Sequence, residues 1–317
     1  MATMRALQIT RSAPLSINTI PIPTLKPGQA LVKVHYACIH PSDRLNSQGL
    51  FPSTTLPRVP GRDFSGVVTE TNPTSNWIGK EVYGTSGSSL GFTNDGPHAQ
   101  YISVPQDALV EKPSALSMRQ AATVGVPFTT GLICLRKAAV SSTDTVLIIG
   151  STGAVGSIAV QIARAMGCQR VLTAARREEA KPDIVLSGAC PAEELASKIK
   201  ELTVGRGVDV VVDTVGDIAL MGAAIENLAQ KGRYAWIAAP RGRLARSSYR
   251  KEITLVGCNS VSPAIEEAAG LLRSLGDWIE ERLLCAQDES LFRTVKLEDS
   301  VEHGYGKAGE QVVIEMA

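Results

Sequence analysis

The spacing of hydrophobic residues changes near residue 117 and divides the chain into two kinds of segment. Before that point, short β-branched runs such as residues 30–35 and 65–70 are separated by proline and glycine. Nine prolines lie between residues 14 and 73. Because proline lacks a backbone N–H and disrupts a helix interior, this part of the chain predicts strands and turns rather than long helices.

Strands and helices alternate after residue 117. Ser117 is typical of a helix start, and residues 129–139 predict a second helix. Apolar runs then predict strands at 145–149, 170–174, 208–213 and 232–237, with helices at 154–166, 192–203 and 218–229. This alternation predicts an α/β fold with a doubly wound parallel sheet that helices cover on both faces. The last segments predict a helix at 263–275 and a strand at 311–315.

A glycine-rich turn joins strand 145–149 to helix 154–166. Its residues are Gly150, Ser151, Thr152, Gly153, Ala154, Val155 and Gly156. Glycine lets the backbone approach a pyrophosphate closely, and the helix that follows offers free N–H groups and the positive end of its dipole. An ordinary tight turn could carry the same glycines, but the strand before it and the helix after it favour dinucleotide binding.

Arg176 and Arg177 follow the second strand, where sites for NAD usually carry an acid that binds the ribose 2′-hydroxyl. Here the first acid after the strand is Glu178. Two guanidinium groups suit the 2′-phosphate of NADPH, so the sequence predicts NADPH as the cofactor. The alternative is a solvated basic turn at a helix start. Only six residues separate Ala175 from Pro182, which predicts a short turn in place of a helix of ordinary length.

Composition narrows the class of protein. The 317 residues are 44% hydrophobic, a length and composition that suit two modest domains. With 32 basic and 31 acidic residues the net charge is +1, which argues against nucleic acid or an anionic membrane as partner. No apolar stretch approaches the roughly 20 residues of a membrane helix, and no secretory signal is visible. Six cysteines without C-x-x-C spacing indicate reduced thiols, so a soluble cytoplasmic protein is expected.

A series of short motifs follows a recognisable order along nearly the whole chain. In one-letter code they are PGQALVKV from residue 27, PSD from 41, PGRDFSGVV from 60, GPHAQY from 96, LSMRQAA from 116, the glycine-rich turn, GVDVVVDTVG from 207 and GRY from 232. In this order they resemble the medium-chain dehydrogenase/reductase superfamily, in its zinc-independent, quinone oxidoreductase-like branch, which also contains enoyl reductases. The short-chain reductases fit poorly, because their glycine motif lies near the N-terminus.

The resemblance implies an architecture and an activity. It implies a Rossmann-type NADPH-binding domain at 119–261 and a β-rich GroES-like catalytic domain formed by 1–118 plus 262–317. It also implies hydride transfer from NADPH to a small-molecule acceptor, namely an enone, an enoyl group or a quinone. Loops around 45–57, 84–94 and 239–246 are expected to line the substrate pocket. A homodimer paired through the strand near 253–257 is expected by the same resemblance.

The resemblance also bears on zinc. In zinc-bearing relatives the early strand supplies a Cys ligand and the next motif reads Gly-His-Glu. Here His40 stands at the position of that Cys, Arg62 replaces the His and Asp63 replaces the Glu. A guanidinium group cannot ligate Zn²⁺ and repels it, so no metal is expected. His40 together with Asp63 remains the alternative as a metal-binding pair.

Three residues are candidates for contact with the reacting groups. The resemblance implies that Thr129 contacts the nicotinamide end of the cofactor, although a threonine there can also bond to its own helix. His40 is the titratable group that the resemblance places near the cofactor, and its ordinary pKa near 6.5 suits acid–base work. Relatives carry Asn at this position and a Tyr where Leu45 stands, and a packing role for His40 is the alternative. Tyr83 is a second candidate proton donor.

Asp43 and Asp63 are flanked by turn residues and are expected to brace loops. Two other functions remain open at this stage. The chain could retain NADPH as a scaffold for a non-redox isomerisation or cyclisation, or it could be a non-enzymatic NADPH-binding protein of the crystallin kind.

Overall fold

The computed structural model describes residues 2–11, 15–237, 251–307 and 309–316. The chain folds into two compact units. Unit 1 comprises Met1–Thr129 with Ser260–Ala317, and unit 2 comprises Thr130–Asn259. The first junction falls eleven residues after the expected boundary at 118, inside helix α2 (Met118–Lys137). The change of pattern at residue 117 therefore marks the start of a helix, whereas the unit ends further along that helix.

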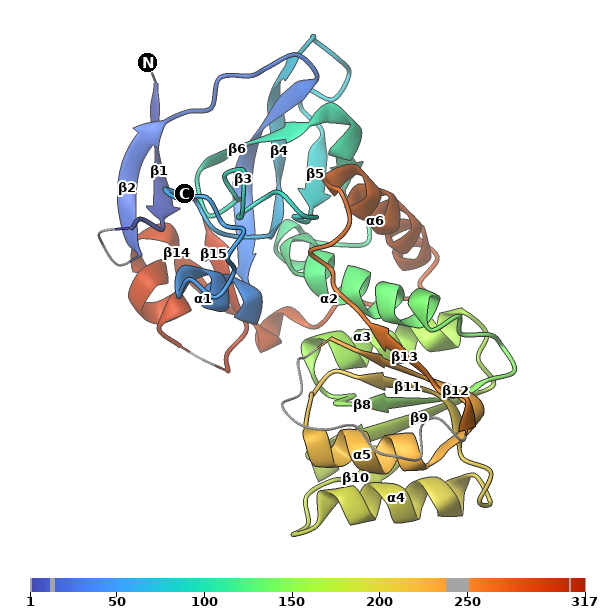
Figure 1. Cartoon of the computed structure of the whole chain (residues 1–317). Helices are drawn as coiled ribbons and strands as arrows, with labels where there is room; N and C mark the ends of the chain where they lie inside the picture. The colour runs from blue at the N-terminus through green and yellow to red at the C-terminus, as the bar shows by residue number, and fades with distance from the viewer. Residues whose placement is uncertain (1, 12–14, 238–250, 308, 317) are drawn as a thin grey trace. The chain divides into compact units, whose positions relative to one another are not determined.

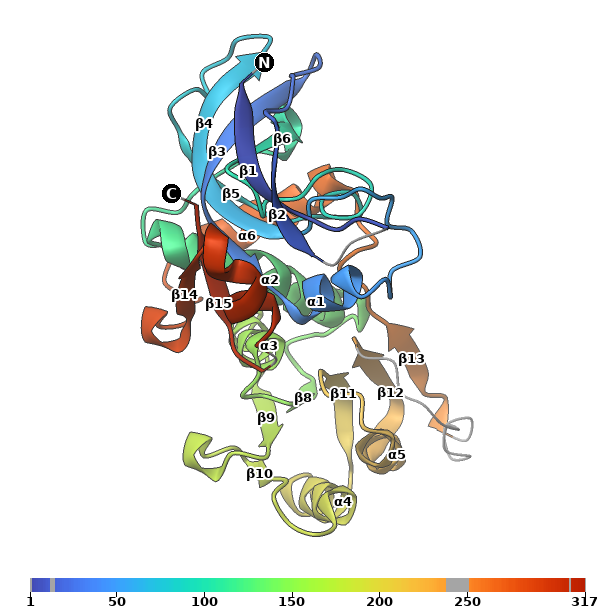
Figure 2. The same ribbon diagram turned by 90° about the vertical axis from the view of Figure 1, so that its left-hand side faces the viewer.

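Unit 1 is built on a seven-stranded sheet. Its strands follow the order β14-β15-β3-β4-β5-β7, and β6 also pairs with β3. Their bounds are β3 Gln29–Ile39, β4 Asp63–Asn72, β5 Glu81–Gly84, β6 Tyr101–Pro105, β7 Val110–Glu111, β14 Arg293–Lys296 and β15 Val312–Glu315. Figure 2 shows the long curved strands β3 and β4 side by side. The C-terminal strand β15 pairs antiparallel with β3, as the resemblance implies for a chain that returns to its first domain.

The remaining elements of unit 1 surround this sheet. They include the hairpin of β1 (Thr3–Gln8) and β2 (Ser16–Pro21), the short helix α1 (Pro41–Ser47), and α6 (Ile265–Glu280). The helix predicted at 263–275 begins at Ile265 and extends to residue 280, with Gly276 inside it. A Cβ at Gly276 would lie 3.0 Å from the Tyr83 hydroxyl, so glycine lets α6 approach that tyrosine closely.

Unit 2 is a six-stranded parallel sheet in the order β10-β9-β8-β11-β12-β13. The strands are β8 Thr145–Ile149, β9 Arg170–Ala175, β10 Ile184–Val185, β11 Val208–Asp213, β12 Leu228–Trp236 and β13 Thr254–Gly257. The helices of this unit after α2 are α3 Ala154–Ala165, α4 Pro191–Leu202 and α5 Ile218–Glu226. Figure 1 shows α3 on one face of the sheet and α4 with α5 on the other. The predicted doubly wound α/β fold is therefore confirmed.

Two details of the prediction are wrong. Residues 118–137 form one helix rather than two, because Pro127 is accommodated inside α2. The predicted helix at 218–229 ends at Glu226, since Leu228 already pairs with Val208 at the start of β12. None of the helices in the described ranges has both the length and the apolar character needed to span a bilayer.

Candidate functional site

The glycine-rich turn lies at the carboxyl end of β8, beside β9. Gly150 has a φ of +82°, a conformation that glycine adopts without the strain a Cβ would bring. The backbone N–H groups of Gly150 and Ser151 donate to the carbonyl oxygen of Ala174 at 2.9 and 3.1 Å. These bonds fix the turn to the end of the neighbouring strand. The turn therefore lies at the carboxyl-terminal ends of the parallel strands, where sheets of this kind bind ligands.

The three glycines of this turn serve different purposes. A Cβ at Gly156 would clash with the Gly150 carbonyl group, 2.7 Å from its carbon, so glycine is required for the close packing of α3 on the turn. A Cβ at Gly150 would lie 2.8 Å from Val215 Cγ2. At Gly153 the nearest described atom to such a Cβ is the Gly150 carbonyl oxygen at 3.3 Å, so one side of the turn remains open to a ligand.

Helix α3 begins at Ala154, with Gly153 as its N-cap and no side chain to cap it. Among the described residues, no acceptor is found for the N–H groups of Ala154, Val155 and Gly156. Free N–H groups and the helix dipole make this end of α3 suitable for the oxygens of a phosphate group. The turn and the helix end together fit the pyrophosphate of a dinucleotide.

Arg176 and Arg177 directly follow β9, and both are exposed. The Arg177 guanidinium group donates to the Thr152 carbonyl oxygen at 2.7 Å, which holds this cation against the glycine-rich turn. After it comes a single 3₁₀ turn at Glu178–Ala180. The prediction of a short turn in place of an ordinary helix is confirmed.

Thr129 uses its hydroxyl within its own helix, where it donates to the Gly125 carbonyl oxygen at 2.7 Å. The neighbouring Thr130 hydroxyl is buried and has no hydrogen-bond partner among the described residues. A buried polar atom without a partner is costly, so this hydroxyl is suited to a bound polar group. The sequence indicates Thr129 and not Thr130, because a pair of neighbouring threonines does not show which hydroxyl forms a hydrogen bond within its own helix.

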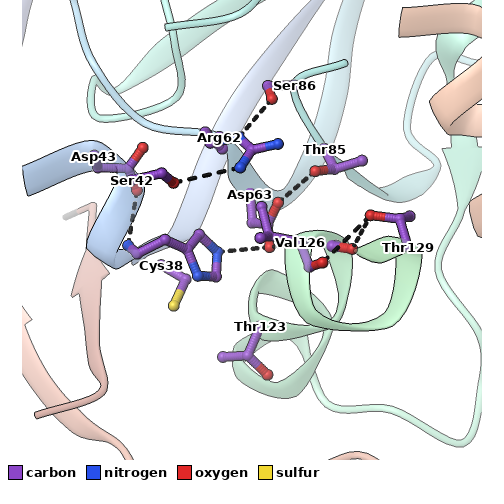
Figure 3. A network of polar contacts seen from close by, with 12 residues as sticks. Cys38, Ser42, Asp43, Arg62, Asp63, Thr85, Ser86, Thr123, Val126 and Thr129 are labelled. Atoms are coloured by element: carbon purple, nitrogen blue, oxygen red, sulfur yellow. Dashed lines mark hydrogen bonds and ion pairs between the residues drawn. The ribbon is translucent and has the colours of Figure 1, made fainter. Parts of the chain in front are cut away.

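Asp63 is the centre of a buried polar network in unit 1 (Figure 3). It opens β4 and lies opposite Cys38 of β3, so the sheet register brings it close to His40 just beyond the end of β3. Its carboxylate accepts from the Thr85 hydroxyl at 2.6 Å, from the Val126 N–H at 2.6 Å and from His40 Nε2 at 2.7 Å.

Helix α2 is adapted to this carboxylate. Pro127 cannot donate a backbone hydrogen bond, and its ring disturbs the preceding turn of the helix. In that turn, the Val126 N–H donates to the Asp63 carboxylate. A Cβ at Gly125 would lie 2.5 Å from the carboxyl carbon of Asp63, so only glycine allows this approach. The expected bracing role of Asp63 is therefore observed: it links β4, the residue that follows β5, α2 and His40.

His40 is 6% exposed and is oriented by its neighbours. Its backbone N–H donates to Asp43 at 2.7 Å. Burial acts to lower the pKa of His40, but the Cys38 sulfur and the Asp63 carboxylate, each close to the ring, outweigh it and raise the pKa well above its ordinary value. An ionised carboxylate only accepts, so Nε2 carries a hydrogen that it donates to Asp63. These neighbours therefore favour the protonated form of the ring.

Tyr83 occupies a different position in unit 1. Its hydroxyl donates to the Leu272 carbonyl oxygen of α6 at 2.8 Å, and burial raises its pKa. Among the described contacts, nothing joins Tyr83 to the His40–Asp63 network. The structure therefore gives it a packing role between β5 and α6. Of the loops expected to line a pocket, residues 239–246 lie outside the described residues.

The donor set does not suit a catalytic zinc ion. Within the described ranges, no group of three His, Cys, Asp or Glu side chains is arranged to hold a metal. His40 and Asp63 bond to each other, and the cationic Arg62 immediately precedes Asp63 in the chain. A fixed positive charge beside the pair opposes a divalent cation.

Comparison with known proteins identifies the family of this chain. Residues 26–114 match the model of the alcohol dehydrogenase GroES-like domain, and residues 154–275 match that of the zinc-binding dehydrogenases. A zinc-type alcohol dehydrogenase-like protein of Schizosaccharomyces pombe is 41% identical over 267 residues, which cover 82% of this chain and 79% of the relative. The quinone oxidoreductase of Sus scrofa is 29% identical over 315 residues, covering 94% and 92% of the two chains.

Solved structures agree with these matches. An alcohol dehydrogenase superfamily protein from Novosphingobium aromaticivorans superposes with a TM-score of 0.85 at 26% identity, covering 99% of this chain and 100% of the other. The fold and the glycine-rich turn are those of a nicotinamide-dependent oxidoreductase. The chain belongs to the medium-chain dehydrogenase/reductase superfamily, in its quinone oxidoreductase-like branch.

Proposed function

We propose that this protein is an NADPH-dependent, metal-independent reductase that transfers hydride to a carbon–carbon double bond activated by a carbonyl group, as in an enone, an enoyl group or a quinone. The observation that carries the proposal is the pairing of the open glycine-rich turn with Arg176 and Arg177 at the end of β9. The likeness to proteins named quinone oxidoreductase supports the choice of acceptor.

Each group of residues has a distinct task in this proposal. NADPH, when bound, supplies the hydride. The free N–H groups at the start of α3 bind its pyrophosphate, and the two arginines bind the 2′-phosphate. The imidazolium of His40 would supply, from Nδ1, the proton that a carbanionic product accepts, and Asp63 fixes the orientation of the ring through its bond to Nε2.

Replacing both Arg176 and Arg177 with Ala is expected to weaken NADPH binding by about 100-fold, because two charge-assisted bonds to the phosphate are lost. NADH lacks that phosphate, so its affinity is expected to change by no more than about 3-fold. Fluorescence titration of both cofactors provides the measurement. Arg164→Ala, which removes an exposed cation from α3, is the control and should leave both affinities unchanged. Equal losses for NADPH and NADH in the double variant would refute the assignment.

The reaction itself is tested by incubating the protein with NADPH and a panel of enones, enoyl thioesters and quinones. Stoichiometric loss of NADPH absorbance with at least one acceptor, undiminished after treatment with a metal chelator, is the expected result. Conversion of an acceptor without loss of NADPH would instead indicate non-redox chemistry. Activity that disappears with the chelator and returns with Zn²⁺ would contradict metal independence.

We also propose that the protein forms a homodimer and works in a reducing, cytoplasmic environment. Among the described strands, β13 is one of the two edges of the six-stranded sheet, and its residues are exposed or half-buried, which would suit pairing with a second copy. None of the six cysteines forms a disulfide bond, which agrees with a reducing environment. Light scattering after gel filtration should give twice the mass of the chain, and the mass of a single chain would contradict the dimer.

A further inference from the structure

A buried arginine lies beside the His40–Asp63 network, and none of its hydrogen bonds to described residues goes to a carboxylate. Arg62 is 2% exposed and immediately precedes β4. Its Nε donates to Ser86 Oγ at 2.8 Å, Nη1 donates to Ser42 Oγ at 3.3 Å, and Nη2 donates to the carbonyl and hydroxyl oxygens of Ser260 at 3.2 Å each. Figure 3 shows the guanidinium group between Ser42 and Ser86, above the Asp63 carboxylate.

All of these partners are neutral oxygens. In the described part of the chain, no carboxylate oxygen lies within 4.0 Å of the Arg62 nitrogens. Asp63 and Asp43 are near enough to act on Arg62 through space, but their described hydrogen bonds go to other donors. Charged groups are rarely buried unless they are paired, because their desolvation is costly.

One nitrogen of the guanidinium group, Nη1, also has a hydrogen without an acceptor among the described residues. Nη1 carries two hydrogens and has one described acceptor, at the long distance of 3.3 Å. Ser42 and Ser260, which hold the Nη1 and Nη2 end, are half-buried, whereas Ser86 at the Nε end is fully buried. The end of Arg62 with spare hydrogens is therefore the end nearer the surface of the unit.

We infer that Arg62, with the Ser42 and Ser260 hydroxyls, forms an oxyanion subsite that binds the carbonyl oxygen of the substrate. The inference rests on the proposed function and deepens it, because it names the residues that would bind the carbonyl oxygen of the conjugated acceptor. An alkene that lacks this oxygen would not be activated.

The chemistry of conjugate reduction creates the charge that such a subsite stabilises. Hydride adds to the β carbon, the π electrons of the double bond move toward the carbonyl, and the carbonyl oxygen becomes an enolate oxygen. The α carbon then takes a proton, and the carbonyl re-forms. Arginine keeps its charge at all relevant pH values, and donors already in place where charge develops lower the barrier most in a dry site. His40, two residues before Ser42, is the neighbouring proton source.

The test uses p-nitrophenol, whose phenolate is a planar conjugated oxyanion with its own absorption band, titrated into the full-length protein with NADP⁺ present. The wild-type protein is expected to bind the phenolate form in preference to the neutral phenol. Arg62→Met, which removes the charge while keeping a long side chain, should weaken phenolate binding about 10- to 100-fold. NADP⁺ affinity should stay unchanged, because the cofactor-binding turn belongs to unit 2. Arg11→Met, an exposed position of unit 1, is the matched control.

Circular dichroism and thermal unfolding report whether the variants fold. If Arg62→Met does not fold, Arg62→Lys replaces it: a single ammonium charge cannot reproduce the planar fork, so phenolate binding should weaken about 10-fold. An unchanged phenolate affinity in a folded Arg62 variant, or equal affinity of the wild type for phenol and phenolate, would overturn the inference. A wild-type protein that consumes NADPH with enones but shows either result would leave the proposed function standing. Absence of NADPH consumption with every acceptor would instead defeat the proposed function.

Discussion

Replacement of Asp63 with Asn is expected to lower the free energy of unfolding by about 3 kcal/mol and to reduce kcat by about 100-fold. Asp63 is fully buried and accepts three hydrogen bonds, from Thr85, Val126 and His40. An amide has only one acceptor oxygen, so at least one of these donors loses its partner. Without the carboxylate, His40 also loses the attraction that favours its protonated form, and with it the proton that we assign to the reaction.

The same pair makes stability depend on pH. The pKa of folded His40 is raised well above its unfolded value of about 6.5, since Cys38 and Asp63 outweigh the effect of burial. The contribution of His40 to the free energy of unfolding is therefore fully present below about pH 6.5, and it is lost as the pH rises through the pKa of the folded state. The other imidazole nearby, His98, has its pKa lowered by burial and is not expected to add to this loss. Asp63→Asn should flatten the alkaline decline of the thermal midpoint.

Thermal and urea unfolding at several pH values measure both effects, and Asp107→Asn, at an exposed position, is the matched control. The control is expected to change stability by no more than about 0.5 kcal/mol. An Asp63→Asn protein as stable as the wild type, with the same alkaline decline, would contradict the role assigned to the pair.

Replacement of Gly156 with Ala is expected to weaken NADPH binding by more than about 100-fold, because the added methyl group displaces the turn that binds the pyrophosphate. The new Cβ would clash with the Gly150 carbonyl group and lie 3.1 Å from Ser151 Cα. These neighbours are backbone atoms, so relief requires movement of the turn or of α3. Calorimetric titration of the folded variant with NADPH gives the affinity.

Gly222→Ala is the control for this substitution, since Gly222 lies inside α5 and nothing is within 4 Å of an added Cβ. Alanine there should keep the cofactor affinity and increase stability by about 0.5 to 1 kcal/mol. If Gly156→Ala bound NADPH as tightly as Gly222→Ala, the turn would not be the site of the pyrophosphate.

The sequence predicts unit 2 well because its signals are local. The strand at 145–149, the glycine-rich turn and the amphipathic helix that follows are neighbours in the chain, and periodicity and turn chemistry define them directly. The helix through Pro127 was predicted as two runs, because a proline normally ends a helix and the compensating bond from Val126 to Asp63 joins residues 63 positions apart.

The polar centre of unit 1 could be predicted only in part for the same reason. The resemblance placed His40 and Asp63 near each other, but not the hydrogen bond between them or its effect on the pKa of His40. The sequence offers Tyr83 as a candidate donor, whereas the partner of its hydroxyl, the Leu272 carbonyl oxygen, is 189 positions away. Arg62 was interpreted only as a residue that excludes zinc, since nothing local shows that three serines from distant segments surround it.

The central claim is that the turn at residues 150–156, with Arg176 and Arg177, binds a phosphorylated nicotinamide dinucleotide. Isothermal titration of the wild-type protein with NADPH and, separately, with NADH is the most direct measurement. We expect this site to give saturable heat with one NADPH bound per chain and to bind NADH clearly more weakly. A flat NADPH titration, or NADH bound more tightly than NADPH, would contradict it.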